Sequence, residues 1–247
     1  MTTKRRTNNH HPVRTIIVTF ILLLLFIVGL VFVFNEPIKQ YMVSQMSQKT
    51  MEQPLDKKTT KTAQAFAKGK PSAQQQKEYK DFEVSYQLDK VKPLSIQDVT
   101  KERMKHKKVP MLGKIAVPSV RLCLPIVPGV SNASLSTGAG TLKKDDQMGV
   151  GNFALASHNM NDYTTLFSPL LNVKVGAKMY VTNGDRVYVY TVKTKRYIAP
   201  TEVQVIDNHQ KSELTLITCS LDGSKRLLVQ GPLVQTTSYN QYHAIFE

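Results

Sequence analysis

One uncharged run near the N-terminus constrains this 247-residue chain more than any other feature. The run extends from Ile16 to Phe34, and Thr19 is its one polar residue. A helix of about 20 apolar residues crosses the hydrocarbon core of a bilayer. We therefore expect residues 16–34 to be a single-pass transmembrane anchor in the cell membrane.

The residues that flank this run predict its orientation. Several basic residues, the last of them Arg14, precede the run, and such residues stay on the cytoplasmic side of a membrane span. We expect residues 1–15 in the cytoplasm and the chain after the run outside the cell. A cleaved signal peptide is the competing interpretation, but its apolar core is shorter and ends at small residues. Here the run ends at Phe32-Val-Phe-Asn-Glu-Pro37.

The chain is basic throughout, with a formal net charge of +15 at pH 7. Residues 1–81 carry 13 Lys/Arg against 5 Asp/Glu, and residues 82–247 carry 20 against 13. Much of the basicity would therefore lie beside the membrane, where it attracts anionic lipids or wall polymers. No basic–aromatic module of the kind that binds nucleic acid is present, and we expect no nucleic-acid partner.

Composition changes along the rest of the chain. Residues 35–81 are rich in Gln, Lys, Ser and Thr and lack a sustained apolar period, so we expect an extracellular polar spacer. Residues 94–107 predict a helix with Ser95 as its N-cap. From Lys114 onward short apolar segments dominate, and we place one catalytic domain over residues 82–247.

The apolar segments of this domain predict short strands separated by turn residues. Residues 178–182 and 186–192 flank Asn183-Gly184, a dipeptide that tolerates the positive φ of a tight hairpin turn. Seven or eight such strands with few helices predict a mainly β fold, a closed or nearly closed barrel. The other strand segments are residues 114–117, 121–127, 151–157, 212–219, 226–231 and 233–236, with short helical pieces at residues 131–136 and 163–171.

Three side chains that can carry chemistry lie at the ends of strand segments. Cys219 closes one segment and Arg226 opens the next, so adjacent strands would hold both at one end of the sheet. A nearby permanent cation favours the thiolate, which is the nucleophilic form of cysteine. His158 also follows an apolar segment and would move protons. The pattern predicts a covalent-catalysis site, although each of the three also fits an ordinary structural position.

The second cysteine, Cys123, lies inside the strand-like segment 121–127. A lone cysteine in such a segment usually acts as a small buried hydrophobe. A disulfide with Cys219 is the alternative in an exported chain, and it would silence the proposed nucleophile.

The segment Thr215-Leu-Ile-Thr-Cys219 resembles the signature of a class A sortase, with Arg226 on the following strand and an upstream histidine in Ala156-Ser-His158. The resemblance covers residues 82–247 and agrees with an N-terminal anchor. It implies an eight-stranded β-barrel. It also implies a housekeeping cysteine transpeptidase of Gram-positive bacteria, which joins secreted proteins bearing a C-terminal Leu-Pro-any-Thr-Gly signal to the cell wall.

The resemblance also implies a role for each candidate residue. Cys219 would attack the carbonyl between Thr and Gly of the signal and form a thioester. His158 would protonate the leaving amine and then deprotonate the incoming amine, supplied by a lipid-linked peptidoglycan peptide. Arg226 would hold the substrate backbone or stabilise the oxyanion.

A groove for the Leu-Pro pair needs apolar walls. The resemblance places Thr218 in contact with substrate, and the segment 198–212 is long enough for a mobile substrate loop. It assigns the walls to Ile198, Pro200 and Val203, the floor to Ala156 and Ile217, and a neighbouring position to Ala139. Whether residues 82–112 cover this groove stays open.

Some class A sortases bind calcium between the loops that precede the His and Cys strands. Here the first loop reads Thr141-Leu-Lys-Lys-Asp-Asp146, with lysines where acidic ligands are wanted. Calcium takes six or more oxygen ligands, and Asp145, Asp146 and Asp207 alone are too few. We therefore expect no metal and no other cofactor.

Three other functions are compatible with the same residues. A pilus-polymerising sortase is the nearest, but the chain shows no second apolar anchor and no obvious lid segment. A catalytically silent wall-binding module would use the same barrel without chemistry. A hydrolase that releases wall proteins would form the same thioester and pass it to water.

Overall fold

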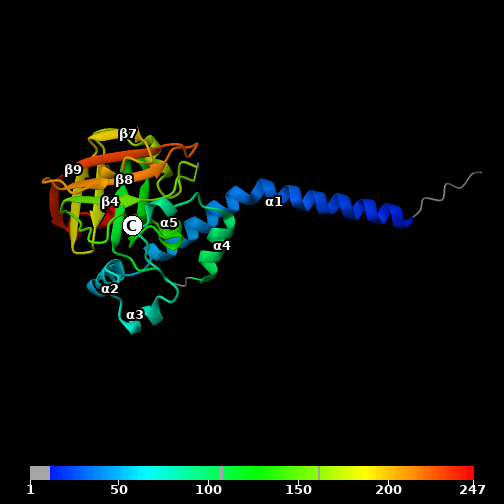
Figure 1. Cartoon of the computed structure of the whole chain (residues 1–247), viewed down its shortest axis with the longest axis horizontal. Coiled ribbons are helices and arrows are strands. Elements are labelled where there is room, and N and C mark those ends of the chain that lie inside the picture. Colours follow the sequence, from blue (N-terminus) through cyan, green and yellow to red (C-terminus); the bar gives the residue numbers. More distant parts are fainter. Residues whose placement is uncertain (1–11, 106–107, 161) are drawn as a thin grey trace, which may run out of the picture. The chain divides into compact units, whose positions relative to one another are not determined.

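Eight strands close into a barrel in the computed structural model, which describes residues 12–105, 108–160 and 162–247 (Figure 1). In that described part of the chain the strand order is β6-β5-β1-β2-β3-β4-β8-β9, and β9 pairs with β6 to complete the ring. The prediction of a closed barrel is confirmed. The strands are β1 Gly113–Val117, β2 Leu122–Val127, β3 Ala139–Thr141, β4 Asn152–Ala156, β5 Lys178–Thr182, β6 Arg186–Thr191, β7 Thr194–Ile198, β8 Glu213–Cys219 and β9 Arg226–Ser238.

A ninth strand, β7, lies at the end of this sheet. The long strand β9 pairs with β6 through its C-terminal half, and with β7 through its N-terminal half, where Ile198 faces Arg226. Strands β6 and β7 therefore follow one another along the same side of β9, opposite β8. The segment after β7, which leads to β8, begins level with the end of β8 that carries Cys219, and Arg226 of β9 lies between them.

The β5–β6 hairpin forms as predicted, but its connection is longer than a two-residue turn. The last pair of the ladder is Thr182 with Val187, so four residues lie between these paired positions. Gly184 has φ +87°, and the Asn183 side chain accepts hydrogen bonds from the backbone N–H groups of Asp185 and Arg186. A side-chain turn of this kind, which Asn favours, replaces the tight primed turn.

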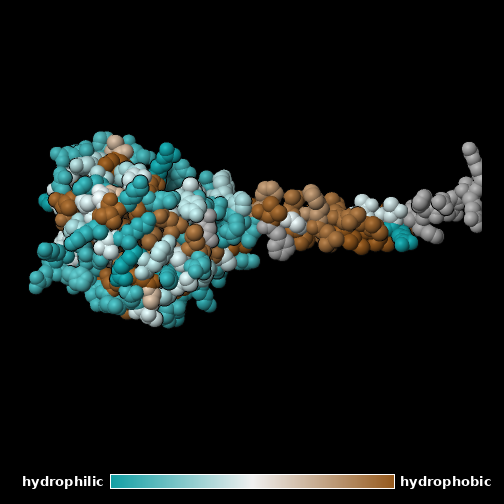
Figure 2. All heavy atoms as spheres, turned by 90° about the horizontal axis from the view of Figure 1, so that it is seen from above, coloured by the Kyte–Doolittle hydropathy of each residue, from teal (hydrophilic) through white to brown (hydrophobic). Residues whose placement is uncertain are grey.

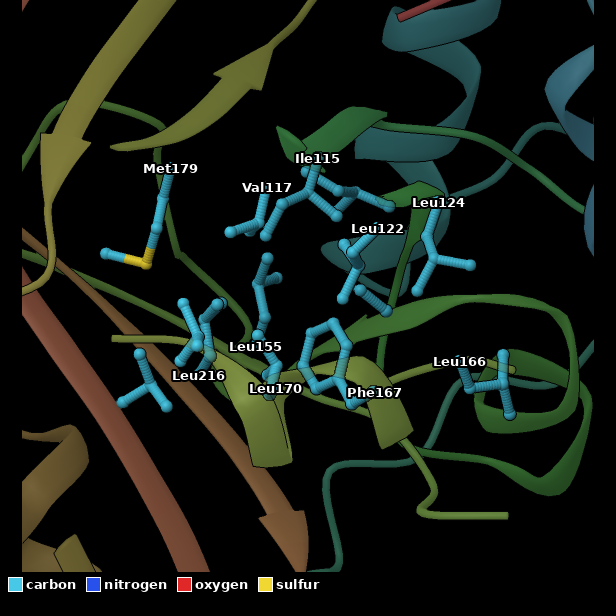
Figure 3. Packing of buried hydrophobic residues seen from close by; sticks show 14 of the residues in the cluster. Ile115, Val117, Leu122, Leu124, Leu155, Leu166, Phe167, Leu170, Met179 and Leu216 are labelled. Atoms are coloured by element: carbon cyan, nitrogen blue, oxygen red, sulfur yellow. The ribbon is translucent and has the colours of Figure 1, made fainter. Parts of the chain in front are cut away.

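The barrel interior is filled by branched and aromatic side chains from most of the strands. Figure 3 shows Ile115 and Val117 of β1 packed near Leu155 of β4 and Leu216 of β8, all fully buried. Phe167, just before the 3₁₀ helix Ser168–Asn172, adds a fully buried ring to this cluster. Burying apolar area in this way is the main favourable term in folding, and it fixes the strands whose ends carry the candidate residues.

The chain divides into two units, residues 1–38 and residues 39–247. Helix α1, Pro12–Met51, contributes to both. In the first unit its segment Val13–Leu30 is long and apolar enough to cross a membrane, by length and composition only, and a signal sequence passes the same test. Its side chains are exposed, and Figure 2 shows the hydrophobic colour along this part of the helix. The anchor over residues 16–34 therefore stays a prediction.

The polar spacer expected over residues 35–81 needs correction. Residues 39–81 belong to the same unit as the barrel, where Val43 of α1 is fully buried in the main core. Phe66, Tyr79 and Phe82 form a second buried cluster, in which the Phe66 ring lies edge-on to both other rings. The helices of this region are α2 Lys57–Ala67, α3 Ala73–Glu78 and α4 Ile96–Lys105.

The composition of this region hides its packing because only one face of α2 and of α4 is buried, and α3 has no buried residue. On α2, Ala63, Phe66 and Ala67 are buried, and the exposed residues of the helix are polar. The sequence of α2 therefore shows no long apolar period. Helix α4 lies inside the predicted range 94–107, and Ser95 caps it, accepting from the N–H of Asp98 at 3.1 Å. Residues 106–107 of that range lie outside the described residues.

Replacing Phe66 by Ala tests whether residues 39–81 are part of the folded unit. We expect the free energy of unfolding to fall by about 3–5 kcal/mol, because a buried ring and its two aromatic contacts are lost. The measurement is urea unfolding followed by circular dichroism. Lys61→Ala on the exposed face of the same helix is the control, and equal stability of the two variants would restore the spacer interpretation.

Candidate active site

An open groove of about 570 Å³ lies where strands β4 and β8 end and β9 begins. The predicted trio, Cys219, His158 and Arg226, all line it. Its walls are otherwise mostly apolar, which suits a ligand with apolar side chains. The remaining lining residues are Leu88, Asp89, Val91, Val130, Leu135, Leu142, Ala156, Ser157, Ile198, Ala199, Pro200, Thr201, Glu202, Val203, Val205, Ile206, Ile217 and Thr218.

Strand pairing brings the trio to this end of the barrel. Cys219 and Arg226 are the last antiparallel pair of β8 and β9. Strand β4 runs parallel to β8, and its last residue, Ala156, pairs with Ile217. Because parallel strands advance together, His158 follows β4 by two residues just as Cys219 follows Ile217. The three side chains are therefore level along the sheet.

Cys219 is a half-buried free thiol, as is Cys123. The turn at residues 220–225 fixes the end of β8 that carries Cys219. In this turn the N–H of Ser220 donates to the Lys225 carbonyl and the N–H of Lys225 donates to Ser220 Oγ, both at 3.0 Å. Asn159 also holds it, because Asn159 Nδ2 donates to the carbonyl of Cys219 at 3.0 Å. The backbone around the thiol is thus tied on two sides.

Cys123 differs from Cys219 in its surroundings. It lies on β2 beside a small apolar cluster that includes Val187 and Phe246. Burial raises the pKa of the Cys123 thiol above its ordinary value, which makes it a weaker nucleophile at neutral pH.

His158 is almost completely buried, with 5% of its surface exposed. Its Nε2 atom has no hydrogen-bond partner among the described residues. Burial lowers the pKa of His158 to about 4; the positive charge of Lys39 acts in the same direction, and the carboxylate of Asp98 opposes it. The imidazole is therefore neutral at pH 7, with one ring nitrogen unengaged.

Arg226 is half-buried, and its guanidinium is anchored on the turn beside Cys219. Nη1 donates to the carbonyls of Gly223 and Lys225, each at 3.1 Å. A guanidinium carries five N–H donors, so others are left for a ligand oxygen. The turn itself is held by Asp222, and the hydrogen bonds from Ser220 and Ser224 lower the pKa of that carboxyl to about 2.

Most of the predicted groove residues line the groove, and one does not. Ala156, Ile198, Pro200, Val203, Ile217 and Thr218 are all in its lining. Ala139 is fully buried in β3 and belongs to the main core, because its strand pairs with Ile126 of β2 inside the barrel wall. Ala139 is therefore not part of the groove lining, and its assignment to substrate binding stays a prediction.

The buried position of Thr218 limits the contact with substrate that the resemblance implies for it. Its hydroxyl donates to the carbonyl of Ser157 at 2.8 Å, and the side chain is 2% exposed. It therefore ties β8 to the residue that precedes His158.

The sequence left open whether residues 82–112 cover the groove, and it did not identify which of them reach it. Leu88, Asp89 and Val91 line the groove although they lie upstream of the barrel. Leu88 and Val91 pack against a cluster of buried residues that includes Leu135 and Leu142. Two apolar residues three apart in a polar stretch were the available signal, and that pattern is too short to predict packing.

The described residues contain no group of three or more His, Cys, Asp and Glu side chains suited to a metal ion. In the loop where calcium ligands were considered, Asp146 is paired with Lys143 at 3.1 Å. A cation of the chain itself therefore lies beside the most buried carboxylate of that loop.

Comparison with known proteins gives one consistent result. A family model described as the sortase domain matches residues 115–234. Sortase A of Streptococcus agalactiae serotype III is 35% identical over 236 residues, which cover 89% of this chain and 85% of that protein. Sortase A of Listeria monocytogenes serovar 1/2a is 34% identical over 219 residues, covering 87% and 91%. A solved structure of Listeria monocytogenes sortase A matches with a TM-score of 0.52 and 41% identity, covering 53% of this chain and 96% of that one.

The buried, neutral imidazole predicts a specific pH dependence. His158 should titrate near pH 4 in the folded chain and near 6.5 when unfolded. The unfolded state therefore binds more protons between these values, and the contribution of His158 to stability, complete above pH 6.5, is lost as the pH falls towards 4. That loss amounts to about 3 kcal/mol. NMR titration of ¹³C-labelled histidine, assigned with His158→Gln, measures the midpoint, and a midpoint near 6.5 would contradict the burial argument.

Proposed function

Because the chain belongs to the sortase A family of cysteine transpeptidases, we propose that it cleaves Leu-Pro-any-Thr-Gly signals between Thr and Gly. It then transfers the acyl product to an amine of a cell-wall precursor. The observation that carries the proposal is the convergence of Cys219, His158 and Arg226 on one groove with apolar walls.

The first half-reaction forms a covalent intermediate. Cys219 Sγ attacks the threonine carbonyl of the signal while the thiol proton passes to His158. Arg226 donates to the oxygen that becomes negative in the tetrahedral intermediate. As the C–N bond breaks, the proton moves from His158 to the leaving glycine nitrogen, and a thioester with Cys219 remains.

The second half-reaction reverses these roles. An acceptor amine attacks the thioester carbonyl and gives a proton to His158. The C–S bond breaks, an amide forms, and the proton returns to Cys219. The neutral state of His158 supports this sequence, because a neutral imidazole accepts a proton twice in each cycle. Its unpartnered Nε2 atom is available for that purpose.

The groove walls support the choice of an apolar pair as the recognised part of the signal. Ile198, Val203 and Ile217 line it together with Cys219. Burying a leucine side chain contributes about 1.5–3 kcal/mol, so such walls discriminate against polar residues. Pro200 adds a rigid apolar surface in the same loop.

The location of the substrates follows from the predicted anchor. An apolar helix near the N-terminus is consistent with a membrane anchor or a signal. Anchored by residues 16–34, the barrel would lie outside the cell membrane, where both partners are found. These partners are secreted proteins that carry the signal and the lipid-linked peptidoglycan peptide.

Cys219→Ala provides the direct test of the chemistry. The full chain in detergent micelles is incubated with a Leu-Pro-any-Thr-Gly peptide, with or without a glycine or alanine amine, and followed by mass spectrometry. We expect an acyl adduct on Cys219 in the wild type, resolved to a new amide by the amine. Product formation should fall by about 10³-fold or more in Cys219→Ala and stay unchanged in Cys123→Ala.

The possible outcomes separate the alternatives. Hydrolysis that added amine never diverts would indicate the releasing hydrolase. Peptide binding without any adduct in the wild type would indicate the silent binding module, and either result would overturn the proposed transpeptidation.

Leu88 and Val91 occupy apolar surface that the signal would need, so they should compete with it. Replacing both by Ser should lower KM for the peptide by about tenfold, since about 1–2 kcal/mol of apolar contact with the groove is removed. Steady-state kinetics measures the effect. Lys90→Ser, at an exposed position between them, is the matched control, and an unchanged KM in the double variant would contradict the competition.

A further inference from the structure

The chain after His158 is held by hydrogen bonds to its backbone. The carbonyl of His158 accepts from the N–H of Phe167 at 3.1 Å. Two residues further on, the N–H of Met160 donates to Ser168 Oγ at 2.7 Å, and its carbonyl accepts from Gln40 Nε2 at 3.3 Å. Phe167 and Ser168 are near His158 in the sequence, whereas Gln40 lies 120 positions before Met160, on helix α1. A remote helix therefore takes part in fixing the backbone that carries the imidazole.

Gln40 belongs to a face of α1 that packs into the barrel unit. Gln40, Val43 and Ser47 follow one another at intervals of three and four residues, which lie on one side of a helix. Val43 is fully buried and belongs to the same core cluster as Met160, and Ser47 is also buried. Met46, close to one helical turn after Val43, packs against this cluster. The hydrogen bond from Gln40 is therefore part of a packed helix face.

A second helix fixes α1 in this position. Lys39 Nζ donates to the carbonyl of Leu94 at 3.3 Å, just before helix α4 begins. Leu94 and Val99 are buried in the core cluster that contains Val43. Residues from 39 onward belong to the barrel unit, so these contacts join α1 and α4 to the barrel within one compact unit.

The charged groups that act on His158 come from these two helices. Burial is the main cause of the lowered pKa of His158; the ammonium of Lys39 on α1 acts in the same direction, and the carboxylate of Asp98 on α4 opposes it. Interactions between charges weaken with distance, so both helices lie near the imidazole. Cys219 and Arg226 line the groove together with His158. The groove residues and the two helices together enclose the histidine, which is 5% exposed.

The position of the imidazole depends on the backbone that carries it. Nε2 has no hydrogen-bond partner among the described residues, so no hydrogen bond at that atom orients the ring. Met160 is buried, and a buried carbonyl that loses its donor is unfavourable. Without the Gln40 amide this carbonyl would turn towards another donor. Because a peptide unit moves as one rigid plane, the turn would displace the residues before it, His158 among them.

We propose that Gln40 is a positioning residue for His158, and that residues 39–50 of helix α1 are part of the catalytic unit. The proposal rests on the proposed function for the role of His158 in proton transfer. Its structural part, that α1 orders residues 158–160, does not depend on the reaction. Gln40 follows the last residue of the predicted anchor by six positions, so the segment that leads out of the anchor is the one that holds the histidine.

Gln40→Met in the full chain in detergent micelles tests the proposal, because methionine keeps the length of the side chain and removes its donor. We expect kcat for the Leu-Pro-any-Thr-Gly peptide to fall about fivefold at pH 7. KM should stay within about twofold of wild type, because neither Gln40 nor Met160 lines the groove. Gln48→Met, at an exposed position of the same helix, is the matched control and should match wild type.

Two further measurements report on His158 without any reaction. In Gln40→Met the NMR titration midpoint of His158 should rise by about one pH unit, because a displaced ring is more hydrated and burial is what lowers its pKa. Amide hydrogen exchange of residues 158–160 should become at least tenfold faster. A contact that only stabilises α1 would lower the unfolding temperature and leave kcat and the midpoint unchanged, and that result would overturn the proposal.

A second variant covers the case in which Gln40→Met fails to fold. Lys39→Gln removes the positive charge next to Gln40 and keeps a side-chain donor for the carbonyl of Leu94. The midpoint of His158 should rise, because Lys39 acts to lower that pKa. An unchanged midpoint would show that this end of α1 does not lie near the imidazole, and would overturn the proposal.

The measurements also separate this proposal from the proposed function. If the wild type does not process the peptide, the proposed function fails, yet the His158 midpoint and the exchange of residues 158–160 still decide whether α1 orders the segment. Unchanged midpoint and exchange in Gln40→Met would overturn the positioning role. A rise in KM with kcat unchanged would also overturn it, because the contact would then serve binding.

Discussion

The position of β8 between two strands of opposite direction is the constraint on which the site depends. The parallel neighbour β4 positions His158, two residues beyond its end, and the antiparallel neighbour β9 positions Arg226, its first residue. His158, Cys219 and Arg226 therefore reach one level although more than sixty positions separate the first from the second. A slip of one residue in the register of a strand turns every side chain of that strand to the opposite face of the sheet. The barrel core that fixes the register therefore also fixes the positions of these three side chains.

Sequence reasoning succeeded where the information was local. The hairpin at Asn183-Gly184, the N-cap at Ser95 and the adjacency of Cys219 and Arg226 each depend on a few neighbouring residues, and the structure contains all three. It failed where the information was distributed. The fate of residues 39–81 depended on single buried residues such as Phe66, which no short window reveals.

The groove shows the same difference between local and distributed information, here for single side chains. Ile217 was expected from the resemblance that residues 215–219 carry, whereas Leu88 comes from a segment that meets the groove only in the folded chain. Lys143 was visible only as a departure from an acidic pattern. Its Nζ contacts oxygens of four residues, and the most distant of them lies 65 positions away along the chain; no one-dimensional pattern encodes these contacts, which are to Asp146, Asn152, Ile206 and Asn208.

Strand β7 has a consequence for how copies of this protein behave beside one another. It ends the sheet order, with β9 on one side, so among the described strands its other side is open to solvent or to another chain. Lys195 and Arg196 occupy its middle, and Pro200 follows it closely. Charged side chains and proline at such an edge oppose the addition of a foreign strand. The barrel is thereby protected against edge-to-edge aggregation even at high local concentration.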